Sequence, residues 1–283
     1  MEKIKPRIIQ VEKKELDLYD YVKREAIESD FGELIRDSCI IKEGDSIKAV
    51  YLRLPPVPLK LREAITRIDY PKGRRTAGLL TTSKIFGSSP REMIRGDYCT
   101  TTALAREDPE AHAAICKYAE NLADYYQEFC PDIYNFHQGI IDEKVKSEWV
   151  IEKSPFTSGI INKNNQLSYH FDRGNFSDVY SNMIALKHEV RGGFLSMPAY
   201  NIGLEIADNS VVFFDGQKIL HGVTPITYLN RDSYRYTLVY YSLKQMWKCE
   251  SPEEELERIK LRKTIREVKR LKRIRGEIPR KIV

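Results

Sequence analysis

The chain has 283 residues, of which 42% are apolar and 10% aromatic, which is enough to bury a substantial core. Its net charge of +5 is unevenly spread, because residues 251–283 carry 12 Lys and Arg against 6 Glu, giving +6 there and −1 (+5 − 6) elsewhere. No run of 18 apolar residues occurs and the first ten residues lack the apolar segment of a signal peptide, which excludes a membrane-spanning class and predicts a cytoplasmic protein.

The first part of the chain mixes helical and strand patterns. Residues 11–37 follow an amphipathic helical period, and SIKAVYLRL at 46–54 reads as a strand that PPVP terminates. A second helix is expected at 59–68. Residues 71–78 combine glycines with charged residues, which predicts an exposed loop.

The middle of the chain changes from helix to strand. A strong helical pattern begins at Asp108, which is placed to cap it, with Pro109 at the first helical position, and ends at Cys130-Pro131. From 147 to 246, short β-branched and aromatic runs alternate with Gly, Asn and Asp turns, which is typical of a sandwich or barrel. We therefore predict an α+β protein with helices around a β core. No glycine-rich nucleotide-binding crossover is present.

The C-terminal segment predicts one long basic helix. Ser251 as N-cap, Pro252 next and Glu254 form a capping box. Residues 258–275 then hold ten Lys and Arg and one Glu. We expect one side of this helix to dock on the core while the other presents charge to a partner; the alternative is only a solvated face packed on the core. The apolar residues at helical spacing are Leu256, Ile259, Ile265, Val268, Leu271 and Ile274.

The spacing of the cysteines does not predict a disulfide framework. They are odd in number, widely scattered and free of CxxC spacing, which argues against disulfides and against a structural zinc site. We expect all five to be reduced, namely Cys39, Cys99, Cys116, Cys130 and Cys249.

Three residues have the pattern of a metal site. His170 and Asp172 in LSYHFDRGNF are two apart, so a strand would place both on one face, although a buried polar pair would look the same. His221 in FFDGQKILHGVTPI follows a strand and a turn, where an antiparallel barrel returns beside its start. Two histidines and a carboxylate leave three positions of a ferrous ion open, which suits a bidentate co-substrate and oxygen.

A buried cation is expected next to this triad. Arg235 lies in the aromatic strand SYRYTLVYYS, where an inward guanidinium requires an anion, unless it lies on the outer face. Arginine binds carboxylates bidentately, so the second carboxylate of 2-oxoglutarate fits, with Thr237 on the same face. The remaining histidines, His112, His137 and His188, are poorer ligands by position.

These segments together resemble a known family. The order HFD, GGFLSMPAYNIGLEI, FFDGQKILHGVTPI and YRYTLVYYS resembles the Fe(II)/2-oxoglutarate dioxygenases, and specifically the TET/JBP group of nucleic-acid 5-methylpyrimidine oxygenases. Residues 85–115 and the run into His170 extend the likeness, which covers 85–245. The resemblance implies a double-stranded β-helix (jelly-roll or cupin-like) core at 85–246 flanked by helices. Residues 1–84 would support it, and 247–283 would form the basic helix and tail.

The resemblance also implies roles at the site. Fe(II) would be held by His170, Asp172 and His221, and Arg235 would pair with the distal carboxylate of 2-oxoglutarate, with O2 as the second co-substrate. Family members often add an arginine or asparagine at the other end of 2-oxoglutarate. The polar residues available for the co-substrate are Thr237, Asn162 and Asn165, with no choice between the two asparagines.

The substrate contacts are expectations of the same kind. Asn175, three residues after Asp172, occupies the position that contacts a flipped base in the family and favours 5-methylcytosine without excluding thymine, unless it serves only the local turn. A methyl group inside a stacked duplex is out of reach, so the base is flipped or the DNA single-stranded. The stacking residues would be Phe171, Phe176 or Tyr200, each of which could instead be core. Phosphate contacts would come from Lys72, Arg74, Arg75, Arg91, Arg95, Arg173 and the basic helix.

The sequence departs from animal TET enzymes because it lacks a Cys/His cluster and a separate modified-base-binding domain. It is therefore similar to a compact microbial or viral version, here expected to act as a monomer that oxidises 5-methylcytosine in DNA. Thymine and RNA remain open as substrates. Two alternatives stay in place: a 2-oxoglutarate-dependent hydroxylase of a small molecule or protein side chain, and a nucleic-acid-binding protein with a vestigial metal site.

Overall fold

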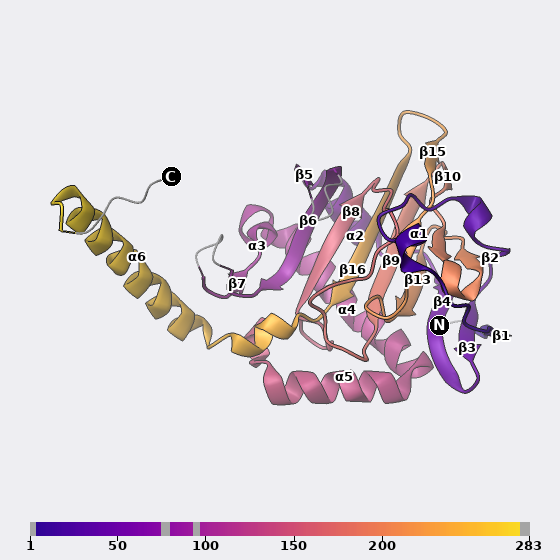
Figure 1. The fold of residues 1–283 in the computed structure, drawn as a ribbon, viewed down its shortest axis with the longest axis horizontal. Coiled ribbons are helices and arrows are strands. Elements are labelled where there is room, and N and C mark those ends of the chain that lie inside the picture. The colour runs from indigo at the N-terminus through magenta and orange to yellow at the C-terminus, as the bar shows by residue number, and fades with distance from the viewer. Residues whose placement is uncertain (1–3, 75–79, 93–96, 278–283) are drawn as a thin grey trace.

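The computed structural model describes residues 4–74, 80–92 and 97–277, and it has a mixed α+β fold built on one large sheet (Figure 1). Ten strands form this sheet: β1 (Arg7–Gln10), β3 (Cys39–Glu43), β4 (Ser46–Arg53), β5 (Lys72–Arg74), β6 (Leu80–Ser89), β7 (Thr100–Thr101), β8 (Ser158–Lys163), β9 (Ser181–His188), β13 (Ser210–Phe214) and β16 (Tyr234–Tyr241). Their order is β1-β3-β4-β13-β9-β16-β8-β6-β5, with β7 paired to β6. The predicted α+β class is confirmed.

A smaller sheet packs against the inner face of the large one. Its order is β14-β11-β12-β2, made of β2 (Glu33–Ile35), β11 (Leu195–Met197), β12 (Ile202–Leu204) and β14 (Gly222–Val223). Alternate residues of β9 and β13, such as Ala185 and Val212, face this sheet and share a buried cluster with Leu195 and Ile202. A separate hairpin pairs β10 (Val190–Gly192) with β15 (Ile226–Tyr228). The finer assignment, a double-stranded β-helix, stays a prediction.

Helices cover the outer face of the large sheet. The other set of alternating strand residues, such as Ile184 and Leu238, packs with Ile115 and Leu122 of α4. Asp108 caps α4 by accepting from the Ala111 amide at 2.9 Å, as predicted. The helices here are α2 (Leu59–Arg67), α3 (Ala103–Glu107), α4 (Pro109–Phe129) and α5 (Pro131–Lys144), of which α3 and α5 were not predicted. Across the described ranges, no helix is both long and apolar enough to pass through a membrane.

The N-terminal region differs most from expectation. Residues 11–37 are not one helix; they contain only the short α1 (Leu18–Tyr21), a 3-10 turn and β2. The backbone here bonds elsewhere, since β2 pairs with β12 and the Lys23 amide donates to the Tyr169 carbonyl at 2.8 Å. Tertiary pairing therefore overrides the amphipathic pattern. β3 and β4 join the large sheet and β6 crosses residue 84, so no break in the sheet marks the predicted boundary.

The cysteine prediction is wrong for one pair. Cys99 and Cys249 form a disulfide, with Cα atoms 5.7 Å apart and 150 residues of separation. A pair so distant leaves no spacing signal in the sequence, because only the fold brings the chain before β7 beside the chain before the last helix. Cys39, Cys116 and Cys130 are free thiols.

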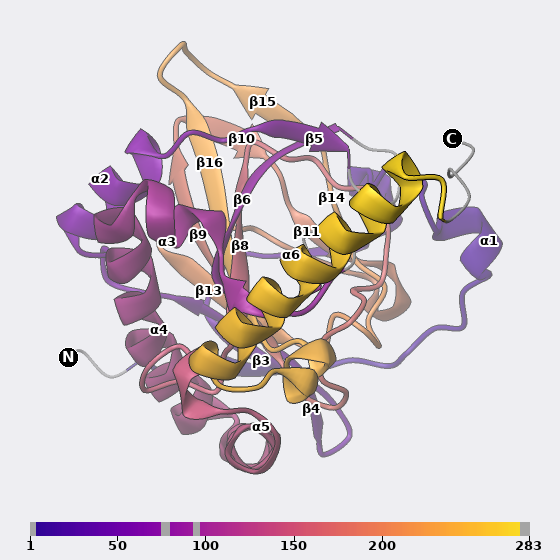
Figure 2. The same ribbon diagram turned by 90° about the vertical axis from the view of Figure 1, so that its left-hand side faces the viewer.

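The C-terminal helix α6 (Pro252–Ile274) forms as predicted, with both hydrogen bonds of the Ser251–Glu254 capping box. Its expected docking on the core is wrong. Glu255 is its one buried residue, and the helix projects from the body (Figure 1). Seen from that side, it crosses in front of the body (Figure 2). Exposed apolar side chains follow it: Leu256, Leu261, Ile265, Val268, Leu271 and Ile274.

The two halves of the α6 surface differ in chemistry. At about 100° per residue, all six exposed apolar residues fall on one half of the circumference, here called the outer face. The inner face is the opposite half, whose Arg258 and Arg262 both pair with Asp97 of the body. It carries Glu255, Arg258, Arg262, Lys263, Arg266, Lys269, Arg270 and Arg273.

Glu255 anchors the base of α6. Its carboxylate, 1% exposed, accepts from Arg91 Nε at 2.9 Å and from the amides of Cys99 and Glu250 at 3.0 Å each. Burial alone would raise the pKa of Glu255, but these hydrogen bonds outweigh burial and hold the pKa below its usual value. The position of α6 therefore depends on one ionised buried side chain.

Glu255→Gln is expected to lower the free energy of unfolding at about pH 7 by about 2 kcal/mol, because charged hydrogen bonds are lost. A depressed folded-state pKa stabilises above the unfolded-state pKa of about 4.3 and is lost as pH falls through the lower folded value. The difference from wild type should therefore shrink in acid. Chemical denaturation of the variant and of wild type, at about pH 7 and in acid, checks this. Glu267→Gln, an exposed helix pair with Arg270, is the control, and equal effects of the two variants would contradict the anchor.

Candidate metal and co-substrate site

Backbone pairing brings the two distant histidines together. His170 and His221 form an antiparallel bridge in which the His170 amide donates to the His221 carbonyl at 2.9 Å and the His221 amide donates back at 3.2 Å. The Asp172 amide donates to the Gly216 carbonyl at 2.8 Å, which fixes the third residue beside the turn after β13. Three side chains thus leave two neighbouring segments toward the same point.

The donor atoms are close enough for one ion. One nitrogen from each histidine and one Asp172 oxygen all lie within 4.8 Å of one another. His170 Nε2 lies 3.8 Å from Asp172 Oδ1, and the His170 and His221 ring centroids are 4.4 Å apart. Small side-chain rotations bring such atoms to the roughly 2.0–2.2 Å of a metal bond. Two nitrogens and one carboxylate suit ferrous iron with open positions.

Both imidazoles are held in the tautomer that a metal requires. The Nδ1 atoms donate to main-chain carbonyls two residues earlier, from His170 to Ser168 at 2.8 Å and from His221 to Ile219 at 2.9 Å. A hydrogen bond of this kind places the proton on Nδ1, orients the ring and leaves the Nε2 lone pair for a metal. The same supporting contact at both histidines favours a metal site over a buried polar pair.

The site opens to solvent on one side. His221 is buried and packs edge-on against Phe214, with ring centroids 4.9 Å apart. The side chains of His170 and Asp172 are 31% and 28% exposed. A reactant can therefore approach the triad from the side of these two residues.

Gly216 makes room for the carboxylate. A Cβ placed there would lie 2.9 Å from Asp172 Cγ and closer still to Oδ2. Because such a contact does not occur between real Cβ atoms and carboxylates, any side chain at this position would push Asp172 aside. Glycine is required by the close approach of Asp172.

Arg235 is a buried side chain that carries a positive charge. Only 2% exposed, it donates through Nη2 to the Gly193 carbonyl at 3.3 Å, while its Nε has no partner among the described residues. No carboxylate of the described chain forms an ion pair with it, and burial lowers the pKa of its guanidinium to about 10. The predicted inward orientation is therefore the observed one.

A second cation, Lys187, stands opposite Arg235 on β9. The two residues are register partners across β16 and β9, so their side chains leave the same face of the sheet. Lys187 Nζ donates to the Gly192 carbonyl at 3.3 Å. Burial, and then the Arg235 charge, lower the pKa of the Lys187 ammonium. Two like charges, one fully and one partly removed from water, are unfavourable unless an anion lies between them.

Polar residues of β16 and β8 continue the same face. Thr237, two residues after Arg235, is the register partner of Asn162, whose Nδ2 donates to Thr237 Oγ1 at 3.5 Å. Asn165 instead bonds the β6 backbone, accepting from the Thr82 amide at 2.9 Å and donating to its carbonyl at 3.1 Å. Asn165 Nδ2 also donates to Asn162 Oδ1 at 3.2 Å, so Asn162 lies on the face of Arg235 and Thr237 and Asn165 links it to β6.

The residues expected to contact a base lie mostly in the interior. Asn175 is 8% exposed and donates to Ser181 Oγ at 3.2 Å. Phe176 packs on Trp247 within a buried cluster, and Tyr200 lies between the two sheets, so the core interpretation holds for both rings. Phe171 is partly buried near the triad and Arg173 is exposed.

The predicted phosphate contacts divide into three groups. The Arg91 guanidinium is held by the buried Glu255, so it is engaged within the protein rather than free for a phosphate. Lys72 is exposed in β5, where Arg74 forms the last backbone position of the strand. Arg75 and Arg95 lie outside the described residues.

The other histidines take no part in a metal cluster of the described chain. His137 is fully buried, contacts Ser242 Oγ at 3.0 Å, and burial lowers its pKa to about 3. His112 accepts from the Gly87 amide at 3.1 Å. His188 ends β9 with its ring against Tyr234.

Two residues of the site were missed by sequence reasoning. Lys187 carries a usable signal, because a lysine within the apolar run DVYSNMIALKHEV needs a partner, but its pairing with Arg235 follows only from the strand register. Gly216 follows Asp215 in a turn, and its contact with Asp172 crosses 44 positions of the sequence, which no local pattern reveals.

Comparison with solved structures shows the fold. A structure described as NgTET1 in complex with 5mC DNA matches with a TM-score of 0.59 at 15% identity, covering 90% of each chain. A 2OG-Fe(II) oxygenase family protein from Burkholderia pseudomallei matches with a TM-score of 0.44 at 13% identity, covering 68% of this chain and 84% of its own. OsALKBH1 matches with a TM-score of 0.38 at 14% identity, covering 66% and 99%. A search of curated proteins found no match.

The family assignment comes from the sequence itself. Residues 91–244, more than half of the chain, match the Tet_JBP family model, described as the oxygenase domain of the 2OGFeDO superfamily. The matched range contains His170, Asp172, His221 and Arg235. This superfamily implies Fe(II), 2-oxoglutarate and O2, for which the donor set described above is suited. The chain belongs to the TET/JBP family of oxygenase domains.

Proposed function

We propose that this protein is an Fe(II)- and 2-oxoglutarate-dependent dioxygenase that oxidises the 5-methyl group of 5-methylcytosine in DNA. One methyl group, one 2-oxoglutarate and one O2 give one hydroxymethyl group, succinate and CO2. The observation that carries the proposal is the convergence of His170, Asp172 and His221, with both histidine tautomers fixed, in one domain with Arg235, a buried cation whose Nε has no partner in the described chain. The two facing sheets would form the double-stranded β-helix of such enzymes.

Each part of the site then has a task. Iron, when bound by the triad, supplies the oxidising chemistry that replaces a C–H bond by C–OH. Arg235 would pair with the distal carboxylate of 2-oxoglutarate, with Thr237 adding a hydroxyl donor. Lys187 would add a second positive charge for the same carboxylate. Asn162, on the same face, is the better placed asparagine for the other end of the co-substrate.

The DNA substrate is supported by three observations. The family is the TET/JBP group, and the solved structure that matches over 90% of this chain is a complex with 5mC DNA. Asn175, three residues after Asp172, supplies an amide next to the triad segment; its hydrogen bond to Ser181 would have to be exchanged for one to the base. The triad itself is partly exposed, as a flipped base requires.

The inner face of α6 is the proposed contact for the DNA backbone. It carries seven Lys and Arg, of which Arg258 and Arg262 are committed to Asp97. Arg270 pairs with Glu267 on the helix itself. Lys263, Arg266, Lys269 and Arg273 continue along the part of the helix that leaves the body and would neutralise phosphates without reading sequence. Lys72 and Arg173 are exposed and would add to this contact.

Incubation with Fe(II), 2-oxoglutarate and methylated DNA is expected to yield 5-hydroxymethylcytosine, detected by mass spectrometry of the released nucleosides. Parallel reactions with unmethylated DNA, which offers only the methyl group of thymine, and with methylated RNA define the substrate. Succinate release without any modified nucleoside would support the hydroxylase alternative instead. Absence of both products would support a vestigial site.

Replacement of a metal ligand by alanine, at His170, Asp172 or His221, should abolish succinate release and weaken Fe(II) or Mn(II) binding, measured by calorimetry, because a facial set needs all three donors. His188→Ala, a histidine outside the cluster, is the matched control and should behave as wild type. Unchanged metal affinity in His221→Ala would contradict the assignment.

Arg235→Met is expected to raise the KM for 2-oxoglutarate by about a hundredfold, since truncating one partner of a buried charge pair costs about 2–5 kcal/mol. Lys187→Met, which removes the outer of the two charges, should raise it by about tenfold. Neither variant should change metal affinity without co-substrate. A KM unchanged in Arg235→Met would show that the carboxylate binds elsewhere.

Gly216→Ala should weaken metal binding while the protein stays folded, because the added methyl displaces the Asp172 carboxylate. The expected loss is about 10- to 100-fold in metal affinity, as for other residues that position ligands. Gly139→Ala on α5, where a Cβ meets nothing within 4 Å, is the control. Wild-type affinity in Gly216→Ala would mean that Asp172 is not a ligand.

A further inference from the structure

The outer face of α6 is an apolar surface that the rest of the described chain leaves uncovered. Its side chains are 38% to 63% exposed over the whole length of the helix. Helices in proteins owe most of their stability to packing of their apolar face, and α6 receives such packing only at its first turn. A helix with this surface is therefore incomplete without a partner.

The outer face is net acidic in its N-terminal half and net basic in its C-terminal half. The first half carries Glu253, Glu254 and Glu257 against Lys260, and the second half carries Lys272 and Arg275 against Glu267. A second α6 laid antiparallel would place the acidic half of each helix beside the basic half of the other. A parallel arrangement would set like charges together. The surface is thus complementary to a reversed copy of itself.

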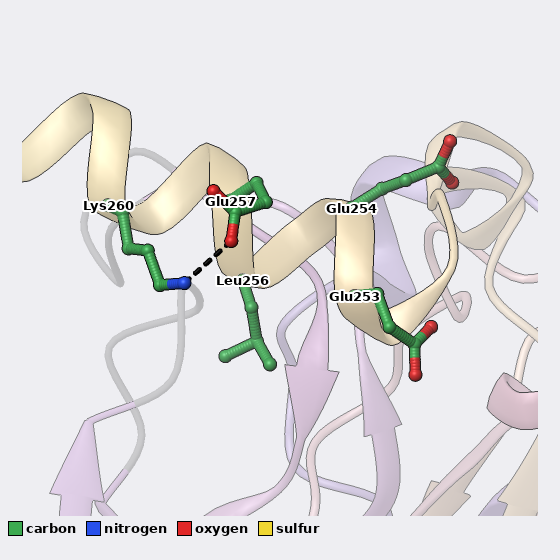
Figure 3. A pocket seen from close by; sticks show the side chains of 5 residues that line it. All are labelled: Glu253, Glu254, Leu256, Glu257 and Lys260. Carbon is green, nitrogen blue, oxygen red and sulfur yellow. Dashed lines mark hydrogen bonds and ion pairs between the residues drawn. The ribbon is translucent and has the colours of Figure 1, made fainter.

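The base of α6 offers a place for the tip of such a copy. A hollow of about 440 Å³ is lined by Glu253, Glu254, Leu256, Glu257 and Lys260 (Figure 3). Leu256 projects into open space there, 56% exposed, beside the Glu257–Lys260 pair. An apolar side chain rimmed by glutamates matches a helix end that carries Leu271 and Ile274 with Lys272 and Arg275.

We propose that α6 mediates homodimerisation through an antiparallel pair of outer faces. Leu261 and Val268 lie on either side of Thr264 and Ile265, in the middle of the exposed apolar series, so a two-fold axis there would bring each against the other. The base of each helix is held by Glu255 and the Cys99–Cys249 disulfide, so the projecting helix is presented in a fixed direction. The inner faces stay available on both copies.

Two other partners fit the outer face less well. DNA phosphates are complementary to the inner face, where the arginines lie, and find apolar side chains and glutamates on the outer one. An anionic lipid surface would be repelled by Glu253, Glu257 and Glu267, which lie among the apolar residues rather than opposite them. The outer face also lacks the Trp and Phe that such helices bury in a membrane.

Sedimentation velocity of the full chain over a wide concentration range tests the proposal. Wild type is expected to dimerise, and Leu261→Asp with Val268→Asp should weaken the dimer by at least about tenfold. Leu59→Asp on α2, more exposed at 69% and on a different helix, is the control for a general loss of solubility. Circular dichroism confirms that each variant keeps its fold.

A charge exchange tests the antiparallel arrangement. Glu257→Lys and Lys272→Glu should each weaken the dimer, and the double variant should restore it, because both intermolecular contacts are reversed together. A monomeric wild type, a dimer that survives the two aspartates, or a double variant no better than the singles would overturn the proposal. So would co-sedimentation of a monomeric protein with anionic vesicles that the aspartates abolish. None of these measurements depends on enzymatic activity, so their failure leaves the proposed reaction untouched.

Discussion

A single antiparallel bridge between His170 and His221 is the contact on which the site depends. It joins the loop after β8 to the residue before β14, and its two hydrogen bonds fix the backbone of both histidines at once. From there, each ring is oriented by a carbonyl two residues earlier in its own segment. A shift of one residue in this register would turn one imidazole to the opposite face, so the three metal-binding side chains would no longer meet.

The second constraint is electrostatic. The sheet carries Arg235 and Lys187 on one inward face without a carboxylate from the described chain, which is costly in the absence of a ligand. A dianionic co-substrate bound at this face, as proposed above, would relieve that cost. Two arginines at the base of α6 are, by contrast, compensated: Arg91 by Glu255 and Arg258 by Asp97. The uncompensated pair therefore supports the proposal that this face binds the co-substrate.

The sequence predicted those features whose pattern lies in neighbouring residues and missed those that depend on contacts between distant residues. The α4 cap at Asp108, the α6 capping box and the strand holding Arg235 rest on neighbouring residues, and all three form as expected. The helix at 11–37 failed because pairing with distant β12 overrides the local period, and the Cys99–Cys249 bond was invisible because it spans 150 residues. Motif order alone located the triad, whereas Lys187 and Gly216 required strand register and three-dimensional contact.

The proposed function requires a metal ion and a dicarboxylate in the places assigned to them. A crystal grown without oxygen with Mn(II) and 2-oxoglutarate gives the direct answer through the anomalous signal of manganese. The predicted map has one strong peak bonded to His170, Asp172 and His221, with the far carboxylate of 2-oxoglutarate at Arg235. A peak away from these three side chains, or a co-substrate that leaves Arg235 without an anion, would contradict it.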